Sequence, residues 1–180
     1  MFTGIITDLG AVKAVGQAAA GSDARFVFAT AYETAAIPEG ASIACSGCCL
    51  TLVDKGAGWF AADVSAETLS KTTLGEWQEG TPVNFERPLK MGDELGGHVV
   101  SGHVDGVARV VDRQPEQGSL RFTLDAPGEL APFIASKRSV RASALTSSRT
   151  PPRSPPWAPA GPVTASTWKS ICSHATFSVS

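Results

Sequence analysis

Short apolar runs rich in β-branched and aromatic residues recur along the chain, separated by turns that contain glycine. Runs of this length and spacing are typical of antiparallel strands in a barrel or sandwich. Two other segments, residues 32–37 and 66–69, are too short for more than one or two helical turns. The pattern therefore predicts an all-β protein. The predicted strands are residues 26–29, 42–45, 50–53, 59–64, 83–86 and 106–111.

The chain also repeats itself at a nearly constant offset of 96 to 98 positions. Any one match could arise by chance, but their common offset favours a duplication. The repeat predicts two similar small barrels in tandem that join near residues 88–97. The matched segments are 2–6 with 100–104, 25–28 with 121–124, and 42–43 with 139–140.

The composition changes abruptly after Lys137. All 17 acidic residues precede this point, whereas six of the 12 prolines follow it. Because each proline removes a backbone donor and fixes φ, residues 147–156 cannot sustain a helix or a central strand. One interpretation is a disordered tail. Two copies of about 97 residues also need more than 180 residues, so we expect the second copy to be incomplete or damaged.

A shifted reading frame is our preferred account of this tail. Codons compatible with residues 163–170, read from their third base, encode Asp-Arg-Val-Asn-Leu-Glu-Val, which matches the pattern of residues 83–86. The same shift continued through Ser178 gives an amphipathic ending. The predicted domains are a first barrel over residues 1–96, the start of a second barrel over 97–137, and an aberrant Pro/Ser/Arg-rich tail over 138–180.

Composition and charge narrow the range of partners. The formal net charge of −2 gives no reason to expect nucleic acid or an anionic membrane as partner. The chain opens without the basic and apolar regions of an export signal, so we expect a cytoplasmic protein with reduced cysteines. Cys45 and Cys48 have the spacing of half a zinc site, but no second pair completes it, and no metal is predicted.

Several short motifs together resemble the riboflavin synthase family of lumazine-binding proteins. None is decisive alone, but they follow the family's order and spacing and cover residues 1 to about 137. The motifs are MFTGI at residues 1–5, GCCLT at 47–51, ETL at 67–69, TLG at 73–75, VNFER at 83–87 and GGHVVSGHV at 96–104.

The resemblance implies two six-stranded Greek-key barrels, of which the second is incomplete or disrupted here. In the family each barrel binds one 6,7-dimethyl-8-ribityllumazine, in a homotrimer assembled through a C-terminal helix. One substrate molecule gives a four-carbon unit to the other, forming riboflavin and 5-amino-6-ribitylaminouracil with no cofactor implied. Each active site pairs an N-terminal barrel with the C-terminal barrel of a neighbouring subunit. Two similar pockets suit this reaction, because two identical molecules must be held face to face.

Two residues are predicted to be catalytic. His103 is the candidate for proton transfer, because the reaction removes a proton from a ring methyl group near neutral pH. His98 is predicted to be structural. Cys49, the second cysteine of the GCCLT motif, could act as a nucleophile or hydrogen-bond donor. The alternative for Cys49 is a small buried apolar residue.

Other positions correspond to the family's substrate contacts. Polar and backbone groups suit a ligand rich in hydroxyl groups, and core, strand-edge and turn roles are the alternatives. Ser46 stands where the family commonly has Asn. The family's second Ser-Leu-Thr run and its acidic residue near the C-terminus are absent. The predicted substrate-binding residues are Phe2, Thr3, Gly4, Ser42, Gly47, Thr51, Glu67, Thr68, Ser101 and Gly102.

Three functions are open from the sequence. The first is a catalytic riboflavin synthase, the second a non-catalytic barrel that binds lumazine or flavin, and the third an inactive product of a frameshifted gene. Cys49 and His103 favour the enzyme, because the binding relatives lack some catalytic residues. For the chain as written we expect weak or no turnover and poor trimer formation, since loss of half a barrel exposes strand edges and apolar surface.

Overall fold

The computed structural model describes residues 1–17, 23–96, 99–116, 119–130, 132, 139–142 and 174–177. Contacts divide the chain into two compact units. The first comprises Met1–Gly106 with Thr176–Ser180, and the second comprises Val107–Ala175.

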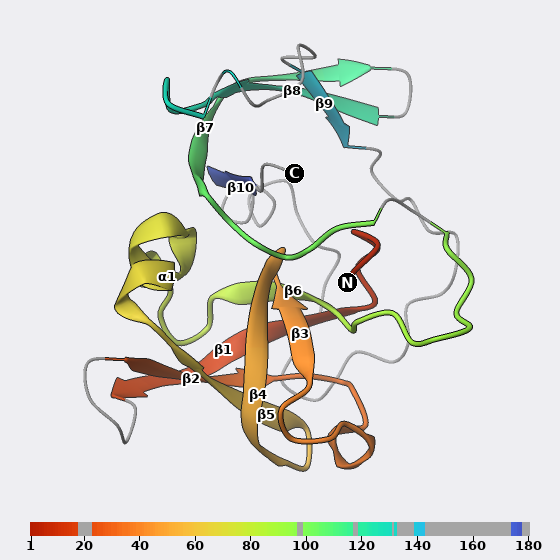
Figure 1. Ribbon diagram of the computed structural model, residues 1–180. Helices are drawn as coiled ribbons and strands as arrows, with labels where there is room; N and C mark the ends of the chain where they lie inside the picture. The colour runs from red at the N-terminus through yellow and green to blue at the C-terminus, as the bar shows by residue number, and fades with distance from the viewer. Residues whose placement is uncertain are drawn as a thin grey trace. The chain divides into compact units, whose positions relative to one another are not determined.

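The first unit contains a closed six-stranded barrel, shown in Figure 1. Around the barrel the strands follow the order β1-β2-β5-β4-β3-β6, and neighbouring strands are antiparallel. β5 returns beside β2, and β6 closes the barrel between β3 and β1, which is a Greek-key arrangement. The predicted all-β fold and first barrel are confirmed. The strands are β1 (Asp8–Gln17), β2 (Ala24–Ala29), β3 (Ser42–Cys45), β4 (Cys48–Gly56), β5 (Trp59–Val64) and β6 (Pro82–Glu86).

The predicted strand bounds agree for β3 and β5, whereas β2, β4 and β6 begin earlier than predicted. The hydrophobic pattern did not predict β1. This strand carries Gly10 and Gly16, has no aromatic residue and buries little besides Val12, so its own sequence gives only a weak strand signal. β1 is held instead by its pairing with β2 and β6.

Three phenylalanine rings from three strands form the centre of the barrel core. Phe28 of β2, Phe60 of β5 and Phe85 of β6 are each fully buried. Their ring centroids are separated by 5.1 Å (Phe28–Phe60), 5.3 Å (Phe60–Phe85) and 5.7 Å (Phe28–Phe85). Aromatic pairs at these separations and tilts stabilise the fold by more than the burial of their apolar area alone. The core thus fixes the end of β6, where Phe85 is followed by Glu86.

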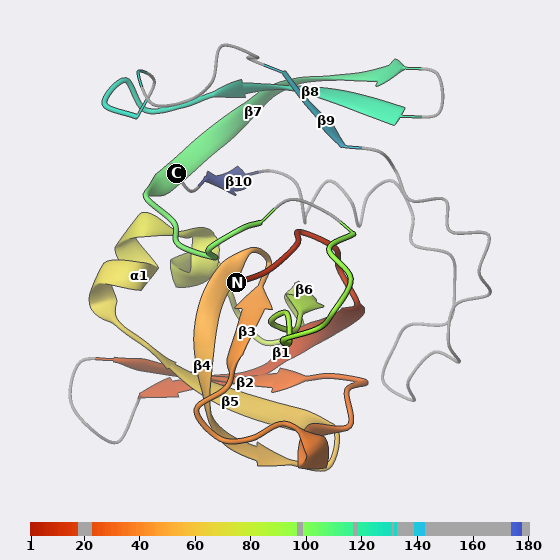
Figure 2. The same cartoon turned by 45° about the vertical axis from the view of Figure 1, so that its right-hand side comes forward.

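Short helical turns connect the strands, as predicted. α1 (Ala66–Lys71) follows β5, as Figure 2 shows, and η1 (Thr34–Ala36) lies between β2 and β3. Ser65 caps α1, since its Oγ accepts a hydrogen bond from the Thr68 backbone N–H at 3.2 Å. A further turn, η2 (Thr73–Glu76), was not predicted and leads toward β6.

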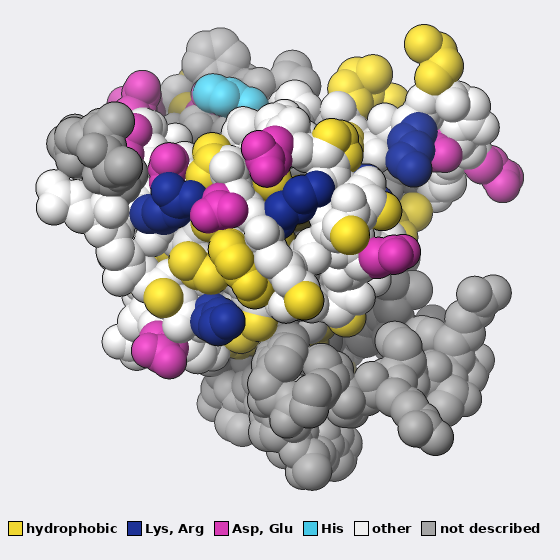
Figure 3. Space-filling model, turned by 90° about the horizontal axis from the view of Figure 1, so that it is seen from below, with side chains coloured by type: hydrophobic (Ala, Val, Ile, Leu, Met, Phe, Trp, Pro, Cys, Tyr) yellow, Lys and Arg dark blue, Asp and Glu magenta, His cyan; other side chains and the backbone are white. Residues whose placement is uncertain are grey.

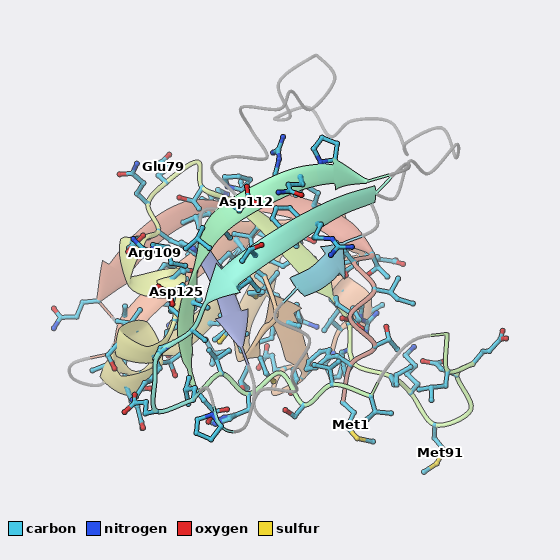
Figure 4. All side chains as sticks on the ribbon, turned by 90° about the horizontal axis from the view of Figure 1, so that it is seen from above. Met1, Glu79, Met91, Arg109, Asp112 and Asp125 are labelled. Atoms are coloured by element: carbon cyan, nitrogen blue, oxygen red, sulfur yellow. The ribbon has the colours of Figure 1, made fainter. Side chains whose placement is uncertain are left out.

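The second unit contributes β7 (Gly106–Glu116), β8 (Ser119–Asp125) and β9 (Ser139–Ala142) to a four-stranded sheet with the order β10-β7-β8-β9, where β10 is His174–Phe177. The register of β7 against β8 shifts between Val110 and Asp112, and that of β1 against β2 shifts between Val12 and Ala14, 98 positions earlier. The sequence repeat thus has a structural counterpart. On this sheet Arg109 and Asp125 are register partners and form an ion pair at 3.2 Å (Figure 4).

The second unit nevertheless departs from the first. β9 begins at Ser139, the sequence counterpart of Ser42 in β3, but β9 pairs with β8, whereas β3 pairs with β4 and β6. In the first barrel the equivalent edge is occupied by β5. Because an unpaired strand edge readily accepts another strand, β9 can pair with the edge of β8 that a counterpart of β5 would otherwise occupy. Among the described residues the second unit is therefore an open sheet, in agreement with an incomplete second barrel.

The predicted domain boundaries at residues 96 and 137 stay predictions. The contact division falls after Gly106 because Val100 and Gly102 hydrogen-bond to Phe2 and Cys49 of the first unit. Apart from Ser139–Ala142 and His174–Phe177, the predicted disordered tail lies outside the described residues.

The surface in Figure 3 carries charges of both signs. Lys and Arg side chains alternate there with Asp and Glu side chains and with scattered hydrophobic ones. A mixed surface accords with the net charge of −2. In the part of the chain that the structure describes, no helix combines the length and apolarity needed to cross a bilayer.

Candidate functional site

The β3–β4 hairpin reverses through Ser46 and Gly47, which have φ values of 47° and 90°. Two successive positive φ values are typical of a type I′ turn, which matches the twist of the flanking strands. The Ser46 side-chain oxygen accepts a hydrogen bond from the Asn84 N–H at 3.3 Å, and the Ser46 N–H donates to the Asn84 carbonyl at 2.7 Å. The turn is therefore attached to β6. Gly47, a predicted binding residue, has a clear role in this turn.

The turn fixes which side chains of the hairpin share a face. Cys48, Leu50 and Leu52 are buried in the barrel, so Cys49 and Thr51 point to its outside. Ser42 is the register partner of Thr51 on the neighbouring strand. Three predicted site residues thus share one surface, the outer hairpin face, made of Ser42, Cys49 and Thr51.

The three described cysteines have different environments. Cys45 is fully buried, and loss of solvent raises the pKa of its thiol well above the usual range. Burial raises the pKa of Cys48 to about 11, with a smaller contribution from the neighbouring Cys49. Cys49 is only half-buried. Of these three thiols, Cys49 is the one placed to meet a ligand. Cys172 lies outside the described residues.

Gly102 lies directly against Cys49 and Phe2. The Cys49 N–H donates to the Gly102 carbonyl at 2.9 Å. A Cβ at position 102 would lie 2.7 Å from the Cys49 Cβ and 2.9 Å from the Phe2 ring, and Gly102 also has a φ of 79°. Both the left-handed backbone and the close approach require glycine. The structure therefore brings together three predicted site residues that lie far apart in the sequence.

Phe2 contributes to this cluster by packing. Its side chain is 2% exposed, which agrees with the core role considered as the alternative. Its backbone forms an isolated antiparallel bridge with Val100, in which each residue donates its N–H to the carbonyl of the other, at 2.7 and 2.8 Å. The N-terminal segment is thereby joined to the segment that leads to Gly102.

Glu86 is a site residue to which sequence reasoning gave no role. One carboxylate oxygen, Oε1, accepts hydrogen bonds from the Thr3 N–H at 2.5 Å and the Thr3 hydroxyl at 2.7 Å. The other, Oε2, accepts from the Gly4 N–H at 3.0 Å. Glu86 is only 5% exposed. The one available signal was a carboxylate directly after the buried Phe85, because glutamate is rarely buried without partners; its partners themselves were not encoded locally.

His103 lies on the same loop as Gly102. Its Nε2 is 3.0 Å from Oδ1 of Asp105, and its backbone N–H donates to the Ser101 hydroxyl oxygen at 3.3 Å. The imidazole is 68% exposed, so a ligand can reach it. When Nε2 carries the proton that it donates to Asp105, Nδ1 keeps the lone pair that a general base needs.

Glu67 and Thr68 lie on α1, where their described hydrogen bonds are local. Thr68 bonds to Ser65, and its carbonyl accepts from the Thr72 hydroxyl at 2.7 Å. Glu67 is exposed, and its carbonyl accepts from Ser70. These contacts do not connect α1 to the outer hairpin face, so the predicted binding roles of Glu67 and Thr68 stay predictions.

An open cavity of about 460 Å³ is lined by residues of the N-terminal segment and of the stretch from Glu86 to Gly96. Of the predicted site residues only Thr3 lines it, together with Glu86. The cavity therefore adjoins the Glu86 contacts and is separate from the outer hairpin face. In the described part of the chain, no three His, Cys, Asp or Glu side chains lie together in a way that could hold a metal ion.

Comparisons with known proteins agree with this geometry. The family model for the lumazine binding domain matches residues 3–88. The riboflavin synthase of Brucella abortus (strain 2308) is 54% identical over 145 residues, which cover 78% of this chain and 71% of that protein. The chain belongs to the riboflavin synthase family. A second riboflavin synthase, from Mycobacterium bovis, is 40% identical over 141 residues, covering 78% of this chain and 69% of the relative.

Solved structures show the same fold. The crystal structure of LumP complexed with riboflavin superimposes with a TM-score of 0.63 and 25% identity, covering 74% of this chain and 72% of LumP. LumP complexed with 6,7-dimethyl-8-(1'-D-ribityl) lumazine gives a TM-score of 0.61 at 24% identity over 72% of this chain and 71% of that one. The resemblance inferred from the motifs is thus confirmed. The matched domain includes Thr3, the outer hairpin face and Glu86, and ends before His103.

Proposed function

We propose that the protein is a riboflavin synthase, a transferase that converts two molecules of 6,7-dimethyl-8-ribityllumazine into riboflavin and 5-amino-6-ribitylaminouracil. The observation that carries this proposal is the contact between half-buried Cys49 of β4 and buried Gly102, which sets the loop that bears the exposed His103 against the hairpin. The identity of 54% with a riboflavin synthase supports the same activity.

The outer hairpin face suits such a substrate. It presents two hydroxyl groups, from Ser42 and Thr51, and the thiol of Cys49. Hydroxyl groups of this kind can bond a ribityl chain, while the adjoining backbone can contact the ring. LumP has been crystallised with the proposed substrate and with the proposed product, which supports a barrel of this fold accepting both.

His103 is the proposed base. It removes a proton from a ring methyl group of one substrate molecule, and Asp105 orients the imidazole for this step. The resulting carbanion attacks the second molecule, and a four-carbon unit passes from one to the other. The two products together contain the atoms and electrons of the two substrates, so the balance needs no external oxidant or reductant.

Further features of the family stay predictions for this chain. They are the homotrimer, the cytoplasmic location, the absence of a cofactor and the domain boundaries. In this scheme the outer hairpin face is completed by the second barrel of a neighbouring subunit, which would hold the second substrate molecule.

The first test is a titration of the purified 180-residue chain with 6,7-dimethyl-8-ribityllumazine, monitored by the fluorescence of the ligand, followed by an assay for riboflavin. We expect saturable binding, with turnover weaker than that of the Brucella abortus relative because the tail departs from the family. Two lumazine molecules should disappear for each riboflavin formed. A chain that does not bind lumazine at all would overturn the proposal.

Three variants refine the test. His103→Ala should reduce the remaining turnover by about 100-fold or more while binding persists, because general base catalysis contributes factors of this size. Cys49→Ser should lower turnover and change ligand affinity. His98→Ala is the matched control, since the sequence places this histidine outside the catalytic pair. Equal turnover in His103→Ala and the unmodified chain would remove His103 from the mechanism, and binding without any turnover would identify a lumazine-binding protein.

A further inference from the structure

The described hydrogen-bond donors to the buried carboxylate of Glu86 are all distant from it in the sequence. Its three described hydrogen bonds come from two consecutive residues, Thr3 and Gly4, which precede it by more than 80 positions. Two of the donors are backbone N–H groups and the third is a hydroxyl, so neutral groups hold the charge. Charge-assisted hydrogen bonds of this kind are short and strong. The carboxylate therefore fixes the path of the backbone at residues 3 and 4.

The backbone position of Thr3 and Gly4 also constrains Phe2, the residue that precedes them. Immediately before Thr3, Phe2 pairs with Val100 through two backbone hydrogen bonds. Two residues after Val100, Gly102 packs against the Phe2 ring and accepts a hydrogen bond from Cys49. A continuous series of contacts thus runs from Glu86 to the thiol-bearing residue of the outer hairpin face.

We propose that Glu86 is a positioning residue for the reaction. Its carboxylate holds the N-terminal segment in the conformation that places Phe2 behind Gly102, and so sets the loop of Gly102 and His103 against Cys49. This inference rests on the proposed function only in its last step, because the control of backbone position can be measured without any ligand.

The rigid support of Glu86 agrees with this role. The preceding residue, Phe85, belongs to the aromatic centre of the core, and Glu86 itself is paired with Ala44 of β3. The N-terminal segment precedes β1 and belongs to no strand of the barrel. Besides its bridge to Val100, its described backbone–backbone hydrogen bonds run only from the Leu89 N–H to the Met1 carbonyl and from the Thr7 N–H to the Phe85 carbonyl. A fixed carboxylate on a rigid strand can therefore order a segment that its own sequence does not order.

The test uses the full chain with Glu86→Ala and Glu86→Gln. Amide hydrogen exchange, followed by mass spectrometry on peptides covering residues 1–6 and 99–104, should accelerate at least about tenfold in Glu86→Ala, whereas exchange in β4 and β5 should not change. The alkylation rate of Cys49 should rise with it. Lumazine affinity should fall at least about fivefold. Glu86→Gln should lie in between, because its amide oxygen can still accept from Thr3 while its amide nitrogen cannot accept from Gly4.

The control is Glu79→Ala, which removes an exposed glutamate just before β6 and should change none of these readouts (Figure 4). Unchanged exchange at residues 1–6 in Glu86→Ala would overturn the proposal, as would parallel acceleration in β4 and β5, which would show a general loss of stability. Loss of lumazine affinity with unchanged exchange would also overturn it, because Glu86 would then contact the ligand itself.

Discussion

Phe2 and Val100 pair through both of their backbone polar groups, although they lie 98 positions apart and are equivalent residues of the sequence repeat. The first residues of the two copies thus run antiparallel to each other, and each makes the same backbone hydrogen bond to the other. Gly4 and Gly102, the equivalent pair two positions further on, share the same φ of 79°. The two copies are thus joined at their first residues, which explains why the segment around Gly102 packs with the first barrel.

The close packing of Gly102 leads to the first prediction. Gly102→Ala places a methyl group 2.7 Å from the Cys49 Cβ in a backbone conformation that favours glycine. We expect lumazine affinity to fall by about tenfold or more, because the loop must move away from Cys49. Gly80→Ala is the matched control, since Gly80 has a φ of 85° but open space around it. Equal effects of the two substitutions on affinity would contradict the steric argument.

A second glycine is required for closure of the barrel. A Cβ at Gly10 would lie 2.1 Å from the Ala29 carbonyl oxygen and 2.3 Å from the Phe85 ring. Gly10→Ala should therefore lower the free energy of unfolding by about 1–3 kcal/mol or prevent folding. Gly16→Ala on the same strand meets nothing within 4 Å and should be neutral or slightly stabilising. Denaturant unfolding of both variants checks this, and a stable Gly10→Ala would show that β1 can shift freely.

The same residues show what the sequence could and could not predict. Local hydrophobic patterns located most strands, and the repeat offset recurred in the structure as the shared register shift of β1 and β7. β1 was missed because it is held by its neighbours and has few bulky residues of its own. Glu86 was missed because its partners are 83 and 82 positions away, and no local pattern encodes such a contact. The motifs identified Cys49 and Gly102, but their contact follows from the fold alone.

The third prediction concerns Ser46, whose φ of 47° is unusual for a residue other than glycine, asparagine or aspartate. Ser46→Asn should keep or raise stability, because Asn tolerates this conformation and retains an acceptor for the Asn84 N–H. Ser46→Val should cost about 1–2 kcal/mol, since a β-branched residue strains the left-handed turn. Thermal unfolding compares the two, and a more stable valine variant would exclude the type I′ turn.

The fourth prediction is a loss of stability in alkali. The Cys48 thiol has a folded-state pKa of about 11, raised from 9.0 by burial. Between these pH values the unfolded chain releases a proton that the folded chain keeps, so the free energy of unfolding should fall as the pH rises from 9 to 11, by about 2 kcal/mol for this group. Burial also raises the pKa of the Cys45 thiol, so this group lowers the free energy of unfolding in alkali as well. Cys48→Ala should show a shallower decline in denaturant unfolding, and an identical slope would contradict the assignment.

The last prediction concerns the reading frame of the tail. We expect resequencing of the gene from the codons for residue 133 onward to reveal a shift that restores a second Ser-Leu-Thr run and the Val-Asn-Leu-Glu ending. In the restored protein the counterpart of β5 should pair with β8, as β5 pairs with β2, and the segment of β9 should pair as β3 does. The restored glutamate would then be the equivalent of Glu86 and could bind Ser101 and Gly102, the repeat partners of Thr3 and Gly4.

Expression of both versions tests this structural consequence. Hydrogen exchange should be slower in β8 of the restored protein, because both of its edges would be paired within a closed barrel. Riboflavin formation should also rise, since a second lumazine site requires a second complete barrel. If the gene keeps the written frame, the expected turnover remains weak and the first barrel accounts for all lumazine binding. Equal turnover by the two versions would show that the closed second barrel is not needed for the reaction.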